Sequence, residues 1–120
     1  RFGRAYTMGL VACETNPQAC VRLSWQLHPT LRPTGGERLE DQVRIMLDNL
    51  ANKVPPGAVG ERRWGAFDAQ GWHTNMEILR DNGQLRRTDI PLDRLFTEAF
   101  VPDFGRFDVQ AVIARARALQ

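Results

Sequence analysis

The sequence predicts a mainly α-helical fold, with about five helices and one short strand near the N-terminus. Two observations lead to this prediction. Apolar residues recur every three or four positions in several segments, and most of these segments begin at a capping residue and end at proline or glycine. A chain of 120 residues can bury a modest core, so we expect residues 1–120 to form a single domain.

The strand is expected first, over residues 5–12, where apolar side chains come close to the alternation of a half-buried strand. Its apolar residues are Tyr6, Met8, Leu10 and Val11. A first helix is expected over residues 16–28. Asn16 and Pro17 are typical of a helix start, because asparagine caps free amides and proline needs no partner for its missing N–H.

The clearest amphipathic helix is expected over residues 37–53. Its apolar residues recur at helical spacing: Leu39, Val43, Met46, Leu47, Leu50 and Val54. The sequence Pro55-Pro56-Gly57 ends it.

A third helix is expected from Asp68 to Asn82. Asp68 serves as the N-cap, and Phe67 and Trp72 form a hydrophobic staple. Asn82-Gly83 is expected to end the helix with a C-cap in the left-handed backbone conformation.

Two further helices are expected toward the C-terminus. One covers about residues 92–100 and ends before Pro102. The last begins at Asp108, with a staple between Phe107 and Val112, and continues to about Leu119.

The charge pattern argues against nucleic-acid binding. The formal net charge is +2, and the arginines are mixed with acidic residues rather than gathered beside aromatic ones. The basic pairs Arg62-Arg63 and Arg86-Arg87 are interpreted as solvated surface, with a docking patch for an acidic partner as the alternative.

The two cysteines do not indicate a metal site, because no second cysteine pair or histidine stands at ligand spacing. Cys20 lies on the apolar face of the first helix, where a thiol usually behaves as a small buried hydrophobe. The alternative is a disulfide with Cys13, which requires an oxidising compartment and α-carbons within about 6 Å.

No pattern predicts catalysis. His28 and His73 could each act as a base, but both are interpreted as surface or half-buried histidines. We therefore expect no enzyme, no catalytic residue, no cofactor and no metal. Trp25 and Trp72 lie on helical apolar faces and are expected to anchor the core, whereas Trp64, in a polar link, is expected to be exposed.

Residues 64–100 read W-G-A-F-D-A-Q-G-W-H-T-N-M-E-I-L-R-D-N-G-Q-L, then a short polar link and P-L-D-R-L-F-T-E-A-F. This order resembles the C-terminal end of solute-binding proteins of ABC importers, in the branch that takes up nitrate, sulfonates, taurine and thiamine-precursor pyrimidines. The stretch G-L-V-A before N-P-Q-A-C, and F-D-V at residues 107–109, resemble further parts of the same family. The resemblance therefore covers nearly the whole chain.

The resemblance implies a fragment of a two-lobe α/β periplasmic binding protein of type II. In that family the lobes clamp a small solute, and the loaded protein docks on a membrane permease driven by an ATPase. The segment before the return strand lines the cleft there. Arg4 is thus the candidate to pair with an anionic solute and Tyr6 to stack on it or hydrogen-bond to it, with an exposed arginine and a core tyrosine as the alternative.

The resemblance also implies that this chain is about the last third of a periplasmic parent. We expect the chain alone to bind solute poorly and to form a homodimer or higher oligomer through uncovered apolar faces. An enzymatic branch of the same fold uses a cysteine-rich iron site, and this chain has no cysteine cluster. The alternative function is a small stand-alone helical module that binds a protein partner through Trp64 and its arginine-flanked surface.

Overall fold

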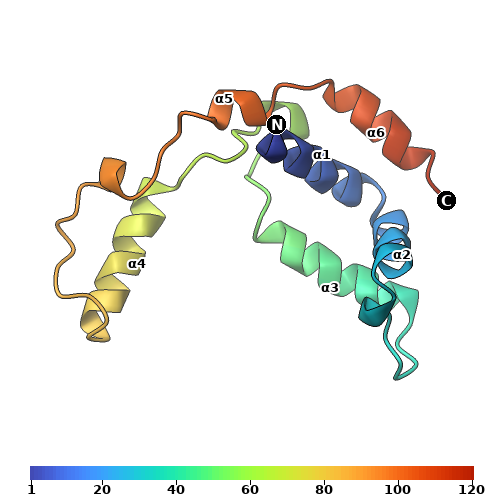
Figure 1. Ribbon diagram of the computed structural model, residues 1–120, viewed down its shortest axis with the longest axis horizontal. Helices are drawn as coiled ribbons and strands as arrows, with labels where there is room; N and C mark the ends of the chain where they lie inside the picture. Colours follow the sequence, from blue (N-terminus) through green and yellow to red (C-terminus); the bar gives the residue numbers. More distant parts are fainter.

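The computed structural model describes all 120 residues, and the fold is all-α (Figure 1). The six α-helices are α1 (Phe2–Thr15), α2 (Pro17–Leu27), α3 (Leu39–Ala51), α4 (Ala69–Asp81), α5 (Val101–Phe104) and α6 (Val109–Arg117). Three single-turn 3₁₀ helices lie in the links: η1 (Pro29–Leu31), η2 (Val59–Glu61) and η3 (Leu92–Arg94). No helix combines the length and the apolar character needed to cross a membrane.

The helices form two limbs joined through α5 and its neighbouring links. Helices α1, α2, α3 and α6 pack together in one limb, and α4 with its return segment forms the other (Figure 1). The radius of gyration is 17.8 Å, whereas a compact domain of this length has one of about 13.6 Å. Only nine of the 120 residues are buried, and the central cluster consists of Val11, Trp64 and Val112.

The strand predicted over residues 5–12 is wrong, because these residues lie within α1. The buried residues of this helix are Thr7 and Val11, which are four positions apart and share one helical face. The β-branched Thr7 is accommodated because its hydroxyl donates to the Gly3 carbonyl at 2.9 Å. The near-alternation of apolar residues therefore does not reflect which side chains are buried.

The predicted helix starts are confirmed where a capping residue was identified. The side chains of Asn16, Asp68 and Asp108 each accept a hydrogen bond from a backbone amide two or three residues later, at 3.0–3.1 Å. Phe67 and Trp72 pack as a staple, with ring centroids 6.1 Å apart.

The predicted end of α4 is also confirmed. Gly83 has a left-handed φ of 71°, and the Gln84 amide donates back to the Leu79 carbonyl at 2.8 Å. This is the Schellman arrangement, which satisfies carbonyls that the helix itself leaves free.

The helix predicted over residues 92–100 is wrong. Only η3 forms there, and α5 begins at Val101 with Pro102 in its first turn. Proline is tolerated at that position because the amides of the first turn have no partner within the helix. Phe96, outside any helix, stacks on Phe67 with ring centroids 4.1 Å apart and so covers the start of α4.

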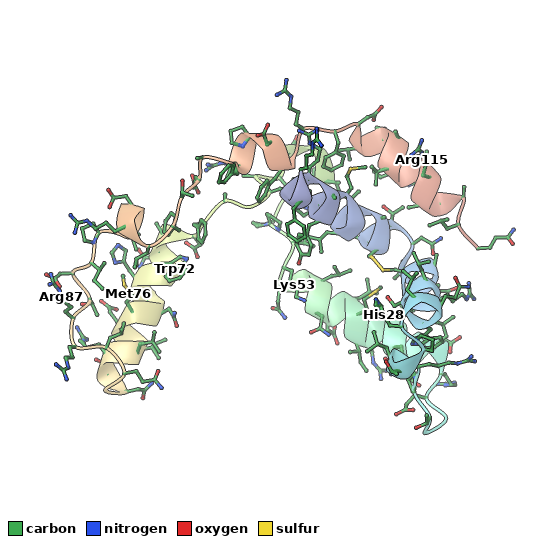
Figure 2. All side chains as sticks on the ribbon, in the orientation of Figure 1. His28, Lys53, Trp72, Met76, Arg87 and Arg115 are labelled. Carbon is green, nitrogen blue, oxygen red and sulfur yellow. A yellow bond between two sulfur atoms is a disulfide. The ribbon has the colours of Figure 1, made fainter.

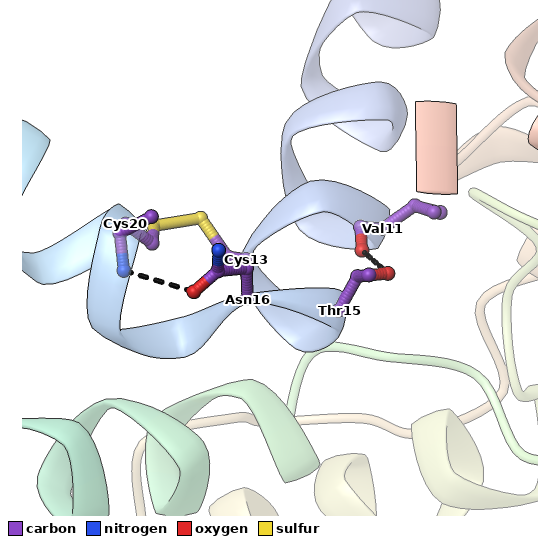
Figure 3. The surroundings of a disulfide bond; sticks show 6 residues. Val11, Cys13, Thr15, Asn16 and Cys20 are labelled. Carbon is purple, nitrogen blue, oxygen red and sulfur yellow. Dashed lines mark hydrogen bonds between the residues drawn. A yellow bond between two sulfur atoms is a disulfide. The ribbon is translucent and has the colours of Figure 1, made fainter. Parts of the chain in front are cut away.

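The corner between α1 and α2 is a single residue, Asn16 (Figure 3). Its side-chain oxygen accepts from the Ala19 amide at 3.1 Å and caps α2. Its side-chain nitrogen donates to the carbonyls of Ala116 at 2.9 Å and Leu119 at 3.0 Å, at the C-terminal end of α6. One amide group therefore caps α2, bonds the C-terminal end of α6 and joins both to α1, although the Ala116 carbonyl also accepts from the Leu119 amide at 3.2 Å.

Cys13 and Cys20 form a disulfide across the same corner, with α-carbons 5.2 Å apart (Figure 3). The interpretation of Cys20 as a free buried thiol is wrong, and the alternative, a disulfide, is confirmed. The tight turn at Asn16 places the first turn of α2 against the last turn of α1, which brings the two cysteines together. The bond is consistent with an oxidising, extracytoplasmic compartment.

Phe104 of α5 lies between two glycines, Gly3 of α1 and Gly65 of the link before α4. A methyl group at either position would overlap the Phe104 ring. Phe104 in turn packs against the cluster of Val11, Trp64 and Val112. The absence of side chains at these two positions therefore allows α5 to approach α1 and the core.

We predict that Gly3→Ala destabilises the fold by about 1–3 kcal/mol, because the Phe104 ring would have to leave its packed position. Gly9→Ala in the same helix is the matched control. Nothing lies within 4 Å of a methyl group at Gly9, so its stability should stay unchanged or rise by up to about 1 kcal/mol. Urea unfolding followed by circular dichroism measures both variants, and equal effects would contradict the packing of Phe104 on Gly3.

Candidate functional site

The predicted ligand contacts, Arg4 and Tyr6, both lie on α1 but point to different sides, because residues two positions apart on a helix are separated by about 200°. Arg4 donates from Nε to the Asp103 carbonyl at 3.3 Å, and its Nη2 lies 4.0 Å from the Asp103 carboxylate. Tyr6 is 53% exposed and stacks on Phe2, with ring centroids 6.3 Å apart. The structure does not bring the two residues into one site, and their role as ligand contacts stays a prediction.

The expected burial of the tryptophans is wrong: Trp64 is the most buried of the three, and Trp25 and Trp72 are less buried. Trp64, predicted to be exposed, is only 4% exposed in the central cluster. Trp25 and Trp72, predicted as core anchors, are half-buried. Trp25 lies beneath the guanidinium of Arg32, whose central carbon is 5.7 Å from the ring centroid. Trp64 is therefore the aromatic residue that holds the core.

The closest ion pair of the larger limb joins Arg62 to Glu14 of α1. Two guanidinium nitrogens of Arg62 donate to the two carboxylate oxygens of Glu14, at 2.6 and 3.0 Å. Nε of Arg62 donates to the Gly57 carbonyl at 2.8 Å, and the guanidinium carbon lies 5.6 Å from the Trp64 ring centroid. Such two-pronged contacts fix geometry as well as charge. We call this group the Arg62 clamp.

The interpretation of the basic pairs as solvated surface is wrong for Arg62, whose side chain is 11% exposed. It holds for Arg63, Arg86 and Arg87, which are exposed. The sequence offers one signal for the difference: Arg62 precedes Trp64 by two positions, so in an extended link the two side chains can share one side.

A cavity of about 280 Å³ lies beside the Arg62 clamp, lined on its other side by Leu47, Leu50 and Val54 of α3 and the link that follows it. Both oxygens of Glu14 accept from Arg62, so this pair supplies neither a free base nor a free cation to the cavity. The arrangement ties the link after α3, at Gly57, and the Trp64 link to Glu14 of α1.

The histidines and the other potential metal ligands do not gather into one site. His28 and His73 are both exposed. No three residues among histidine, cysteine, aspartate and glutamate are placed to hold a metal ion. Every buried side-chain nitrogen or oxygen has a hydrogen-bond partner, so no orphaned polar atom marks a binding site.

Glu98 joins the two segments that connect α4 to the other limb. Its Oε1 accepts from the Phe67 amide at 2.9 Å, and its Oε2 accepts from Nη2 of Arg63 at 3.1 Å. The Phe67 amide lowers the pKa of Glu98 below its ordinary value, and the charge of Arg63 acts in the same direction against the opposing effect of desolvation.

Comparisons of the chain with protein-family models, with curated proteins and with solved structures found no match. The resemblance to solute-binding proteins therefore rests on the motifs alone.

We predict that acid loosens the link that Glu98 closes. Because the pKa of folded Glu98 is lowered from 4.5, the ionised group stabilises the folded link above that pH, and the stabilisation is lost as pH falls through the folded pKa. Glu98→Gln removes the charge but keeps an acceptor for the Phe67 amide, so the acid dependence should largely disappear. An NMR titration of the Phe67 amide measures this, and a midpoint at or above 4.5 in the unsubstituted chain would contradict it.

Proposed function

We propose that this chain is the C-terminal region of a periplasmic solute-binding protein, which delivers a small solute of the nitrate, sulfonate, taurine or pyrimidine class to an ABC importer. The observation that carries the proposal is the amount of apolar surface left open. Twelve large hydrophobic residues are exposed in a chain with nine buried residues. Surface of this kind normally packs against further structure, which the rest of the two-lobe parent would provide.

The positions of the family-like motifs support the proposal. The stretch N-P-Q-A-C begins α2, the stretch from Trp64 leads into the stapled start of α4, and F-D-V begins α6. These three motifs therefore lie at helix starts with a side-chain cap, whereas the fourth, G-L-V-A, lies inside α1. The Cys13–Cys20 disulfide agrees with an oxidising compartment such as the periplasm.

The contacts of Arg4 leave it able to bind an anion in the parent. Only Nε makes a hydrogen bond, and the nearest carboxylate oxygen is 4.0 Å from Nη2. An arginine carries five N–H donors in a planar fork, so the outer edge of the guanidinium can still pair with an oxyanion. We propose Arg4 as the contact to the anionic solute in the parent and Tyr6, on another side of α1, as a separate contact.

The alternative function is a stand-alone helical module that binds a protein partner. The tryptophan on which this alternative rested is not exposed in the structure. That function was assigned to Trp64 and its arginine-flanked surface. Trp64 is buried, and Arg62 beside it is held by Glu14. A start codon directly before the codon for Arg1 in the gene would favour this alternative, whereas an open frame upstream would favour the solute-binding parent.

We predict that the complete product of the gene binds an anionic solute and that Arg4→Gln weakens binding at least about tenfold, through loss of charge-assisted hydrogen bonds. Arg106→Gln is the matched control. Nη1 of Arg106 also lies near the Asp103 carboxylate, at 3.9 Å, and the substitution removes the same charge. Titration calorimetry with nitrate, taurine and an alkanesulfonate measures affinity. Tyr6→Ala tests the stacking contact in the same way.

Two results would count against the proposal. A complete gene product that binds none of these solutes, nor an aminopyrimidine, would remove the transport function. Equal affinities for the Arg4→Gln and Arg106→Gln variants would remove Arg4 from the site while leaving the function intact.

A further inference from the structure

Helices α1 and α6 lie side by side and end at the same corner, where Asn16 reaches the last carbonyls of α6 (Figure 1). An apolar groove of about 470 Å³ runs between them. Half of its apolar lining is small, namely Gly9, Ala12, Ala111 and Ala116, and the other half is larger, namely Met8, Phe107, Val112 and Leu119. Small side chains allow another helix to approach closely, so the groove has the character of a helix-packing surface.

Two opposite charges border the groove on the same face of α6. Asp108 and Arg115 are seven residues apart, which is about 10.5 Å along a helix. Asp108 caps α6 through the Ala111 amide at 3.0 Å, and Arg115 is exposed (Figure 2). Neither side chain takes part in any ion pair of the chain.

We propose that this groove binds α6 of a second copy of the chain, in an antiparallel dimer with twofold symmetry. When the two α6 helices cross antiparallel near Ala111, Asp108 of each copy faces Arg115 of the other. A parallel pair would instead place like charges together. The same face thus carries both Asp108 and Arg115, so two identical copies related by a twofold axis can form two equivalent ion pairs.

Apolar burial drives the association, and the charges fix its direction. Leu119 is 54% exposed at the C-terminal end of the groove. The antiparallel alignment brings it to the Phe107 end of the second copy's groove, where it becomes covered. Helices α1 and α6 of the two copies then form a four-helix layer. The inference concerns self-association of this chain and does not depend on the proposed transport function.

The test is the mass of the chain by analytical ultracentrifugation over a range of concentrations. We expect a monomer–dimer equilibrium in which Arg115→Glu weakens dimerisation about tenfold, because both symmetry-related pairs change from attraction to repulsion. Arg117→Glu is the matched control. It changes the same charge in the same last turn of α6 but does not border the groove, so its dimerisation should be unchanged.

A second variant separates the charge pair from simple damage to α6. Asp108→Asn keeps a helix-capping side chain, so combined with Arg115→Glu it removes the repulsion and should recover part of the lost affinity. Circular dichroism checks that each variant keeps its helices. A chain that stays monomeric at high concentration would assign the groove to another occupant and overturn the proposal, as would equal effects of Arg115→Glu and Arg117→Glu.

Discussion

The larger limb depends on the side chain of Asn16. A helix leaves amides free at its start and carbonyls free at its end, and here the end of α1, the start of α2 and the end of α6 meet at one residue. The Asn16 side chain binds both: its oxygen accepts from the Ala19 amide of α2, and its nitrogen donates to the carbonyls of Ala116 and Leu119. The disulfide next to it holds the corner closed, so α6 can lie along α1 and cover Val11 and Trp64.

The second limb has no comparable anchor. Helix α4 is held by the rings of Phe67, Trp72 and Phe96, of which Phe67 and Phe96 stack and Trp72 is tilted against both, and by the contacts of Glu98 in its connecting segments. Elements with few buried contacts open locally at low free energy, so α4 should open more readily than α1 and α6. A larger protein that covers α4 would remove this difference, which is why the open apolar surface bears on function.

The helix starts that a capping residue marks were predicted correctly, whereas the apolar spacing over residues 5–12 and 92–100 was misleading. Capping residues and staples act within about four positions, and the starts at Asn16, Asp68 and Asp108 were all found. Prediction from the sequence also failed where a residue contacts another that is distant in the chain. Burial of Trp64 depends on the two ends of the sequence, and the contact between Glu14 and Arg62 spans 48 residues. The ligand role of Arg4 depends on structure outside this chain, so neither the sequence nor the fold decides it.

The most direct test of the account is hydrogen exchange in Asn16→Asp. Aspartate can still accept from the Ala19 amide and suits the start of α2, but it cannot donate to the carbonyls of Ala116 and Leu119. We expect amides of α6 to exchange at least about fivefold faster while those of α2 keep their protection. Unchanged protection of α6, or equal losses in both helices, would contradict the role assigned to Asn16.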